Sequence, residues 1–432
     1  PYEPLTRDVD PGDPFTPMLR SYAGDIVKVK IQAGGYEEEH GSTIHGMKWL
    51  QGGSGFGRAP NSGWKNGQAA GISEQFTLST PVVADFSQRG DTADYAWAVN
   101  SSFDGWWNGS WGVLRNYSKL RTDLAALPGN AKPVRLANAK DFNGVCPKAA
   151  PVRRYAITAA LANDILGNPF GVTIVPADEA ATMHAGGKLN PAGGTLVYNP
   201  RDTMTRPFQF IPDDPGEPVL TVGGKQGPLH DPTGIMYVRS SDLDASGRLK
   251  AGVPVEPLVL RAAAGECIEV TLENRLPAVM PDLASLQVLP GTVKRSREER
   301  QGSTTFNYNL MRPSSHVGLH PQLVEYDVTR SDGANVGQNP VQTVAPGGSK
   351  TYQWYAGDLG LQTVDGTPRR TGGERSKAAL AVVGGDAQSS RVNVIATPVE
   401  FGGLNLTPAD KIKQASKGLY GAAVILPPAS TW

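Results

Sequence analysis

Histidine is the residue type in this chain best suited to bind a metal, because a neutral imidazole nitrogen is a good ligand for copper and other transition metals. The 432-residue sequence contains six histidines. His40 and His45 form one close pair, and His316 and His320 form another. Either pair could be part of a copper site. Two ligands are too few for tight binding, so the alternative is that these are turn histidines whose nitrogens hydrogen-bond to the backbone.

The two cysteines, Cys146 and Cys267, allow three interpretations. They could be two buried thiols, a structural disulfide, or the source of a copper thiolate. A type 1 copper uses two histidines and one cysteine, usually with a weak axial methionine. Neither cysteine has a histidine near it in the sequence, so we predict no type 1 copper in this chain.

Two further groups of residues have side chains that could bind a ligand. Asp327 and the segment 331–335 form a loop rich in oxygen ligands, but they lack the regular spacing of a calcium loop, so we expect a turn. A run of tryptophans could form a platform for a sugar or a nucleobase. Aromatic residues before a terminal strand more often cap a sandwich core, and we predict that role here. These residues are Trp97, Trp106, Trp107 and Trp111.

The overall composition excludes several classes of partner. Lys+Arg and Asp+Glu each number 41, so no excess of charge favours nucleic acid or an anionic membrane. No apolar run approaches the ~18–20 residues that span a bilayer, so we expect no membrane span. The 51 glycines and 35 prolines are spread along the whole chain, which indicates many short strands joined by turns.

An internal repeat is the most informative feature of the sequence. When Leu19-Arg20 is aligned with Leu260-Arg261, a Gly-acid turn coincides in both copies, at Gly24-Asp25 and at Gly265-Glu266. Alternating apolar residues follow each turn, which predicts half-buried strands beginning near Asp25 and near Glu266. Three further landmarks recur in the same order: 44–46 with 319–321, 71–76 with 346–354, and 109–114 with 418–425.

The repeat divides the chain into two units. We expect residues 1–125 to be the first, 126–151 to be a loop-rich linker, and 152–432 to be the second, with a long elaboration at about 161–250. The first unit has no equivalent of the strand expected at 152–158, so we interpret it as N-terminally incomplete and the chain as a mature or cleaved fragment. Short strands in two similar units predict an all-β protein made of two Greek-key β-sandwiches.

Several motifs together resemble those of one protein family. They are Glu37-Glu38-x-His40-x4-His45-Gly46-x-x-Trp49, Gly71-Ile-Ser-Glu74, Trp107-Asn-Gly-Ser-Trp-Gly112, Leu229-His-Asp-Pro-Thr233 and the segment His316–Asp327. They are similar to motifs of multicopper oxidases, in particular the large bacterial multicopper-oxidase-like proteins, and the resemblance covers most of residues 15–428. It implies that each unit is a cupredoxin-like sandwich and that the sites are copper sites.

Most of the copper ligands that the resemblance implies are absent. The family pattern uses ten histidines for a full set of centres, and this chain has six. In the aligned turns His40, His45 and His320 are kept. Thr43 and Gly318 stand where the family has its middle histidine. The resemblance therefore implies degenerate copper sites, with a partial site at most.

Two hypotheses follow for the function. The chain is part of an exported multicopper-oxidase-like enzyme, which when intact oxidises metal ions or phenolics with dioxygen and takes its missing ligands from other sequence. Alternatively, it is a copper-free structural or binding cupredoxin module of an extracellular or surface assembly, with other cupredoxin domains or copies of itself as partners. Both hypotheses place it outside the cytoplasm, as an extracellular, periplasmic or cell-surface protein.

The resemblance also favours one interpretation of the cysteines. In cupredoxin-like sandwiches the opening segment runs beside the strand that follows the Gly-acid turn. Cys146 precedes the first strand of the second unit, and Cys267 opens the strand after Gly265-Glu266. We therefore predict a disulfide between Cys146 and Cys267, in agreement with an exported protein.

Overall fold

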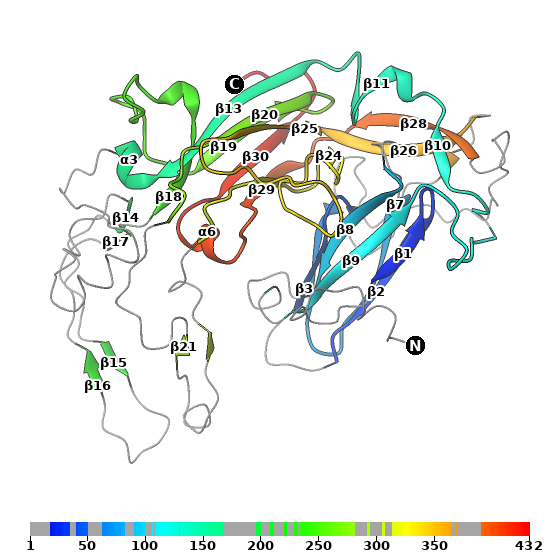
Figure 1. The fold of residues 1–432 in the computed structure, drawn as a ribbon, viewed down its shortest axis with the longest axis horizontal. Coiled ribbons are helices and arrows are strands. Elements are labelled where there is room, and N and C mark those ends of the chain that lie inside the picture. Colours follow the sequence, from blue (N-terminus) through cyan, green and yellow to red (C-terminus); the bar gives the residue numbers. More distant parts are fainter. Residues whose placement is uncertain are drawn as a thin grey trace.

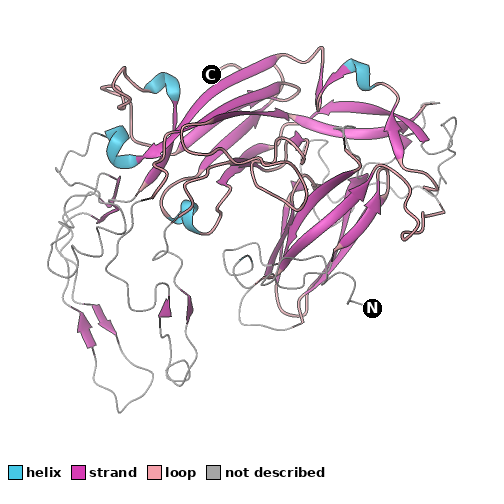
Figure 2. Ribbon diagram, viewed as in Figure 1, coloured by secondary structure: helices cyan, strands magenta, loops and turns pink. Residues whose placement is uncertain are grey.

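The computed structural model describes ten main ranges of the chain and a few short strands between them. Nearly all regular elements in these ranges are β-strands (Figure 2), so the predicted all-β, cupredoxin-like sandwich fold is confirmed. No helix in the described part is both long enough and apolar enough to cross a membrane. The main ranges are 18–34, 40–50, 63–82, 90–99, 106, 109–128, 130–166, 234–280, 313–364 and 390–432.

The first unit consists of a five-stranded and a two-stranded sheet. The larger sheet has the order β1-β9-β8-β3-β6, in which β1 runs parallel to β9 and the other pairs are antiparallel. The smaller sheet pairs β2 with β7. The bounds are β1 Leu19–Tyr22, β2 Ile26–Gln32, β3 His40–Ile44, β6 Gly67–Ala70, β7 Gln75–Val82, β8 Thr92–Ala98 and β9 Trp111–Tyr117, and β4 (Trp49–Leu50) pairs with β5 (Trp64–Lys65).

The second unit contains one five-stranded and one four-stranded sheet. The five-stranded sheet has the order β18-β13-β20-β25-β24, and the four-stranded sheet has the order β19-β30-β29-β23. The bounds are β13 Val152–Leu161, β18 Ile235–Arg239, β19 Leu258–Ala263, β20 Cys267–Asn274, β23 Leu319–Pro321, β24 Glu325–Tyr326, β25 Ser349–Tyr355, β29 Gly402–Pro408 and β30 Gly421–Leu426.

A third sheet joins the predicted linker to the second unit. Strand β10 (Val134–Leu136) runs parallel to β28 (Ser390–Pro398), which pairs with β26 (Gly357–Thr363). The remaining elements are β27 Pro368–Arg369, the short strands β11 Phe142–Asn143, β12 Cys146–Pro147, β14 Leu196–Asn199, β15 Phe208–Phe210, β16 Leu220–Val222, β17 Leu229–Asp231, β21 Thr292–Val293 and β22 Thr305–Phe306, and the helical turns η1 Ala139–Asp141, α3 Ala162–Leu166, η3 Ser240–Asp242 and α6 Lys413–Ser416.

The two Gly-acid turns of the repeat have the same construction. Gly24 and Gly265 adopt left-handed φ angles of 96° and 90°, which glycine accepts without steric cost. The carboxylates of Asp25 and Glu266 each accept a hydrogen bond from the backbone N–H three residues earlier, at 2.7 and 2.8 Å. Strands β2 and β20 start directly after these turns. The strand before each turn also pairs in parallel, β1 with β9 and β19 with β30. The predicted equivalence of the segments around Asp25 and Glu266 is therefore confirmed.

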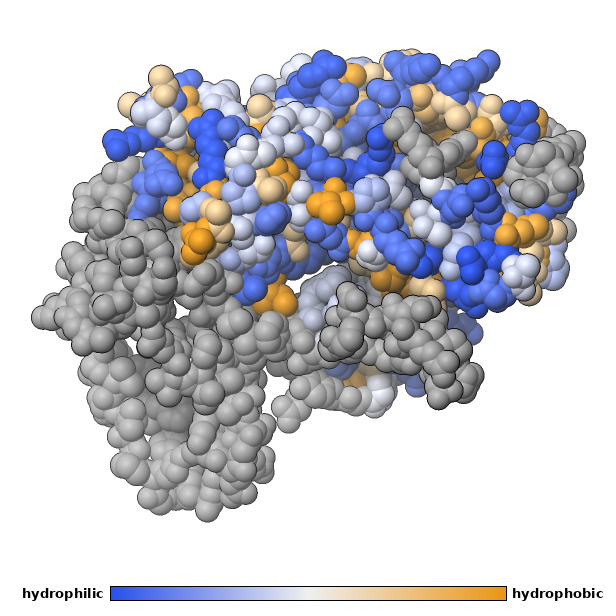
Figure 3. Space-filling model, viewed as in Figure 1, coloured by the Kyte–Doolittle hydropathy of each residue, from blue (hydrophilic) through white to orange (hydrophobic). Residues whose placement is uncertain are grey.

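The two units share one hydrophobic core. Ile44, Tyr95 and Leu114 of the first unit belong to the same buried cluster as Leu319 and Trp354 of the second. In Figure 1 the blue and cyan strands of the first unit stand against one side of the second. The face seen in Figure 3 mixes hydrophilic and hydrophobic side chains where the chain is described. This shared core fixes the position of the turn after β3 relative to the loops of the second unit.

The structure contains a disulfide between Cys146 and Cys267, as the resemblance implied. Their Cα atoms are 5.7 Å apart, and both side chains are buried in a cluster with Val145, Tyr355 and Leu361. Strand β13 runs parallel to β20, so the chain that leads into β13 is held beside the start of β20. No cysteine is left with a free thiol.

Candidate functional site

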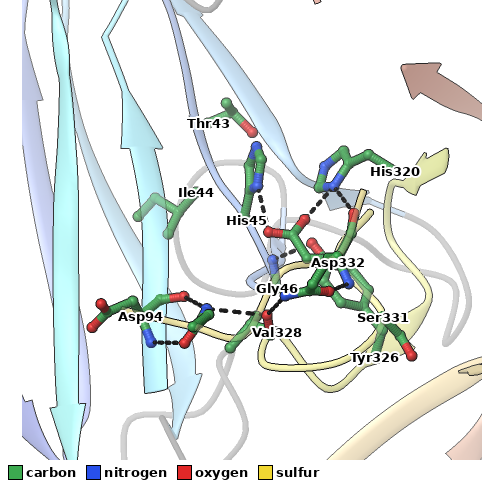
Figure 4. Close-up of polar contacts among 12 residues, drawn as sticks. Thr43, Ile44, His45, Gly46, Asp94, His320, Tyr326, Val328, Ser331 and Asp332 are labelled. Carbon is green, nitrogen blue, oxygen red and sulfur yellow. Dashed lines mark hydrogen bonds and ion pairs between the residues drawn. The ribbon is translucent and has the colours of Figure 1, made fainter. Parts of the chain in front are cut away.

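His45 and His320, which the sequence assigned to equivalent turns of the two units, lie side by side. His45 follows β3 in the first unit, and His320 lies in β23 of the second. Their rings stack, with centroids 4.0 Å apart and an interplanar angle of 29°. Both residues are almost fully buried, at 1% and 2% exposure. The structure thus pairs histidines across the boundary between the units (Figure 4).

The other two predicted site histidines lie elsewhere. His40 is half-buried at the opposite end of β3 and pairs with Ala70. A five-residue strand separates its end Cα atoms by roughly 13 Å, so His40 does not reach the buried cluster around His45. His316 is exposed at the rim of a pocket. Of the remaining two, His184 lies outside the described residues and His230 lies in β17.

Asp332 holds the two stacked histidines in place. Its Oδ2 lies 2.9 Å from Nδ1 of His45, and its Oδ1 lies 2.5 Å from Nδ1 of His320. A carboxylate only accepts hydrogen bonds, so both imidazoles carry their proton on Nδ1 and leave Nε2 as an acceptor. Gln342 supports Asp332 by accepting a hydrogen bond from its backbone N–H at 2.7 Å. Asp332 is completely buried.

Burial sets the protonation states of this cluster. Burial lowers the pKa of His45 to about 3, although Asp332 acts in the opposite direction. Burial and the charge of Lys411 likewise lower the pKa of His320. Burial by itself disfavours the carboxylate of Asp332, but the two histidines outweigh it and hold the pKa of Asp332 well below its usual range. At neutral pH the cluster therefore contains two neutral imidazoles and one carboxylate.

Lys411 completes the cluster from the loop that precedes α6. Its Nζ lies 2.7 Å from Nε2 of His45 and 5.1 Å from the ring centroid of Trp106. Since Nε2 is the acceptor, the ammonium is the donor of this hydrogen bond. Burial lowers the pKa of Lys411 to about 8, with Asp332 opposing the shift. At neutral pH Lys411 is mostly protonated, and its positive charge balances the negative charge of Asp332.

The two positions where the family has a middle histidine serve other purposes here. The hydroxyl of Thr43 donates a hydrogen bond to the backbone oxygen of Asn66 at 2.7 Å, which ties β3 to the turn before β6. Gly318 has no room for a side chain, because a Cβ atom there would collide with the carbonyl of Gly333 and press on Ala409. A histidine at Gly318 is therefore incompatible with this packing.

The donor set does not fit the copper centres that the resemblance implies. Both cysteines belong to the disulfide, so no thiolate is available for a type 1 copper. Among the described residues, the group with metal-ligand spacing is His45, His320 and Asp332. The ammonium of Lys411 already lies against His45. A metal ion 4 Å from this ammonium is repelled by about 4 kcal/mol for each unit of its charge, at an effective dielectric constant near 20.

A second buried ion cluster also joins the two units. Lys48 of the first unit contacts Glu325 and lies 3.3 Å from Asp358, both of the second unit. Its ammonium lies 5.7 Å from the ring centroids of Trp64 and Phe401. Burial raises the pKa of Glu325, against the effect of Lys48. These contacts place the first unit firmly against the loops that carry the histidine cluster.

A pocket of about 590 Å³ opens beside the histidine cluster, between the two units. Trp106 and Trp111 stack at 6.2 Å and form one wall. The predicted role as a core cap therefore describes only part of the environment of Trp106 and Trp111, and Trp107 lies outside the described residues. The other residues that line the pocket come from both units: His45, Ala96, Gly112, Val113, Ser314, His316, Ala334, Asn335, Val336, Gly337, Thr343, Ala409, Asp410, Lys411 and Ile412.

Sequence reasoning missed Asp332 and Lys411. The segment 331–335 was expected to be a turn, and the structure agrees, but the turn also carries the carboxylate that binds both histidines. Its abundance of oxygen ligands was a usable signal. Lys411 has no such signal, because it lies in an ordinary polar loop and reaches His45 only through the packing of the two units.

Comparison with known proteins does not identify a family for this chain. No protein-family model matches the chain, and no curated protein matches it. Among solved structures, it is similar to a copper nitrite reductase from Nitrosomonas europaea, with 12% sequence identity and a TM-score of 0.19, over 95% of this chain and 82% of that one. The strand order and the paired Gly-acid turns described above define the chain as a protein of two cupredoxin-like β-sandwiches.

Proposed function

We propose that this chain is a copper-free module, related to multicopper oxidases, that binds a small molecule in the pocket between its two units. The pocket of about 590 Å³ is the observation that carries the proposal. Ligand sites of this size are typically apolar, with a few polar groups that orient the ligand. Here Trp106 and Trp111 supply the flat apolar wall, and Lys411 supplies a charged group beside them.

An aromatic anion is the natural probe for such a pocket. We expect anilinonaphthalene sulfonate to bind at one saturable site, with a change in its fluorescence. Ala334→Trp fills the pocket and should abolish this binding. Ala69→Trp places the same side chain on an exposed position of β6 and should not change it. Absence of saturable binding to the wild-type protein, or equal binding to both variants, would overturn the proposal.

We also propose a domain organisation, a cellular location and partners for the protein. The two-unit division at 1–125 and 152–432, with an elaboration at about 161–250, follows the internal repeat. The disulfide between Cys146 and Cys267 supports export to an oxidising compartment, such as the periplasm or cell surface. Other cupredoxin domains, or further copies of this chain, are the partners that we propose for it.

The second candidate is a fragment of a multicopper-oxidase-like enzyme. The arrangement of His45 and His320 favours it, because a metal-binding histidine typically donates its second ring N–H to a carboxylate. In that case sequence outside this chain supplies the missing ligands. Dioxygen consumption with a phenolic substrate, measured after incubation with copper on the protein extended by that outside sequence, distinguishes the two. The oxidase hypothesis requires turnover, and the binding-module hypothesis requires none.

A further inference from the structure

The histidine cluster has the protonation state of a metal site. His45 and His320 each direct Nδ1–H to Asp332, so that the lone pair of each Nε2 is available. A carboxylate that holds the far nitrogen of a ligating histidine in this way fixes both its tautomer and its orientation. The stacking of the two rings, with centroids 4.0 Å apart, brings the two side chains together. These two imidazoles are therefore already prepared to bind a cation.

The cation that His45 binds is an amino group of the protein itself. The Nζ of Lys411 lies 2.7 Å from Nε2 of His45, the atom that would bind a metal. In the described part of the chain, this ammonium donates a hydrogen bond to His45 and lies over the ring of Trp106. Lys411 reaches this position from a loop of the second unit, whereas His45 belongs to the first.

The ammonium also performs the electrostatic task of a metal ion. Asp332 is a fully buried carboxylate, and a buried charge needs a compensating charge nearby. The two histidines contribute hydrogen bonds but no net charge when they are neutral. Lys411 supplies the positive charge at the far side of His45, so that a chain of contacts runs from carboxylate to imidazole to ammonium.

We propose that Lys411 replaces a metal ion in this cluster, and that removal of its amino group converts the cluster into a site for a divalent transition metal. The latent ligands are Nε2 of His45 and Nε2 of His320. Asp332 keeps its role of orienting both rings. This inference concerns the cluster alone and does not depend on what the neighbouring pocket binds.

Cobalt(II) is a suitable probe because its visible spectrum reports coordination directly. The experiment titrates Co(II) into wild-type protein and into Lys411→Ala. Lys413→Ala is the matched control, since it removes the same charge from the first residue of α6, two positions further along the chain and outside the pocket lining. We expect Lys411→Ala to bind Co(II) at least tenfold more tightly than wild type and Lys413→Ala. Addition of His45→Gln to Lys411→Ala should abolish the gain.

Equal affinity of wild type and Lys411→Ala for Co(II), or a gain that survives loss of His45, would overturn the inference. If Lys411→Ala does not fold, Lys411→Gln removes the charge but retains a hydrogen-bond donor. In that variant Co(II) should raise the melting temperature, whereas wild type should show no increase. A variant that Co(II) does not stabilise contradicts the inference. Because Co(II) binding is measured without the anionic probe, the outcome of this experiment is independent of the probe-binding result for the wild-type protein.

Discussion

His45 and His320 stack at 4.0 Å because both donate a hydrogen bond to the carboxylate of Asp332. They come from equivalent turns of the two repeats, so two equivalent residues contact each other across the boundary between the units. The contact is maintained by hydrogen bonds and by the charge of Lys411. In the part of the chain that the structure describes, this cluster links the two sandwiches through three buried polar residues, His45, His320 and Asp332.

Replacement of Asp332 by asparagine should strongly destabilise the protein. Asparagine cannot accept hydrogen bonds from both histidines through two oxygens, and the charge of Lys411 loses its counter-ion. Breaking a buried ion pair on one side typically costs about 3–5 kcal/mol. Chemical denaturation of Asp332→Asn measures the loss. Asp123→Asn, which removes an exposed carboxylate paired with Arg20, should leave the denaturation midpoint unchanged; equal effects of the two substitutions would contradict the assignment.

The stability of the protein should fall as the pH is lowered from about 6.5 toward 3. His45 has a pKa of about 3 in the folded protein and an ordinary value of 6.5. Between these values the unfolded chain binds one more proton than the folded chain, so acid favours unfolding by up to about 1.4 kcal/mol per pH unit. The pKa of His320 is shifted in the same direction.

Urea denaturation at a series of pH values measures this dependence. His45→Gln removes one of the linked groups and should make the slope shallower. His316→Gln removes an exposed histidine and should preserve the wild-type slope. A wild-type stability that does not change between pH 6.5 and 4 would show that the buried histidines are not neutral in the folded protein.

Gly318 should not tolerate even a methyl group. A Cβ atom there would collide with the carbonyl of Gly333, whereas a Cβ atom at Gly403 would meet open space. Overpacking typically costs about 1–3 kcal/mol, so Gly318→Ala should lower the free energy of unfolding by at least this much. Gly403→Ala, at an exposed position of β29, should be close to neutral. Two equally stable variants would remove the steric explanation for the missing histidine.

The fold could be predicted largely from local sequence patterns. The Gly-acid turns at Gly24-Asp25 and Gly265-Glu266 and the alternation after them determine short-range geometry, and a repeat of such patterns is visible in one sequence. His45 and His320 could be selected for the same reason, since each follows a recognisable motif in its own repeat.

The partners of these histidines could not be predicted in the same way. Asp332 and Lys411 are ordinary loop residues, and their roles arise from the packing of one unit against the other. The sequence also suggested that histidines close in sequence, such as His40 and His45, share one site. The structure does not bring these two together, because the extended strand β3 lies between them. Contacts between distant segments depend on the whole tertiary structure, which periodicity does not encode.

The disulfide can be checked by counting thiols. Titration of the denatured, unreduced protein should find no reactive thiol, because Cys146 and Cys267 are joined. The bond closes a loop between residues 121 apart, for which the chain-entropy model gives a stabilisation of about 5 kcal/mol at most. The double variant Cys146→Ala/Cys267→Ala should therefore unfold at lower urea concentration. Two reactive thiols per chain would show that the bond is absent.

The copper content of the wild-type protein tests the central claim most directly. The protein is incubated with copper(II), dialysed to remove weakly bound ions, and measured by elemental analysis together with its visible absorption spectrum. Because Lys411 lies against His45 and both cysteines form a disulfide, the account predicts no retained copper and no intense blue charge-transfer band. Copper retained at one equivalent or more per chain, with or without such a band, would contradict it.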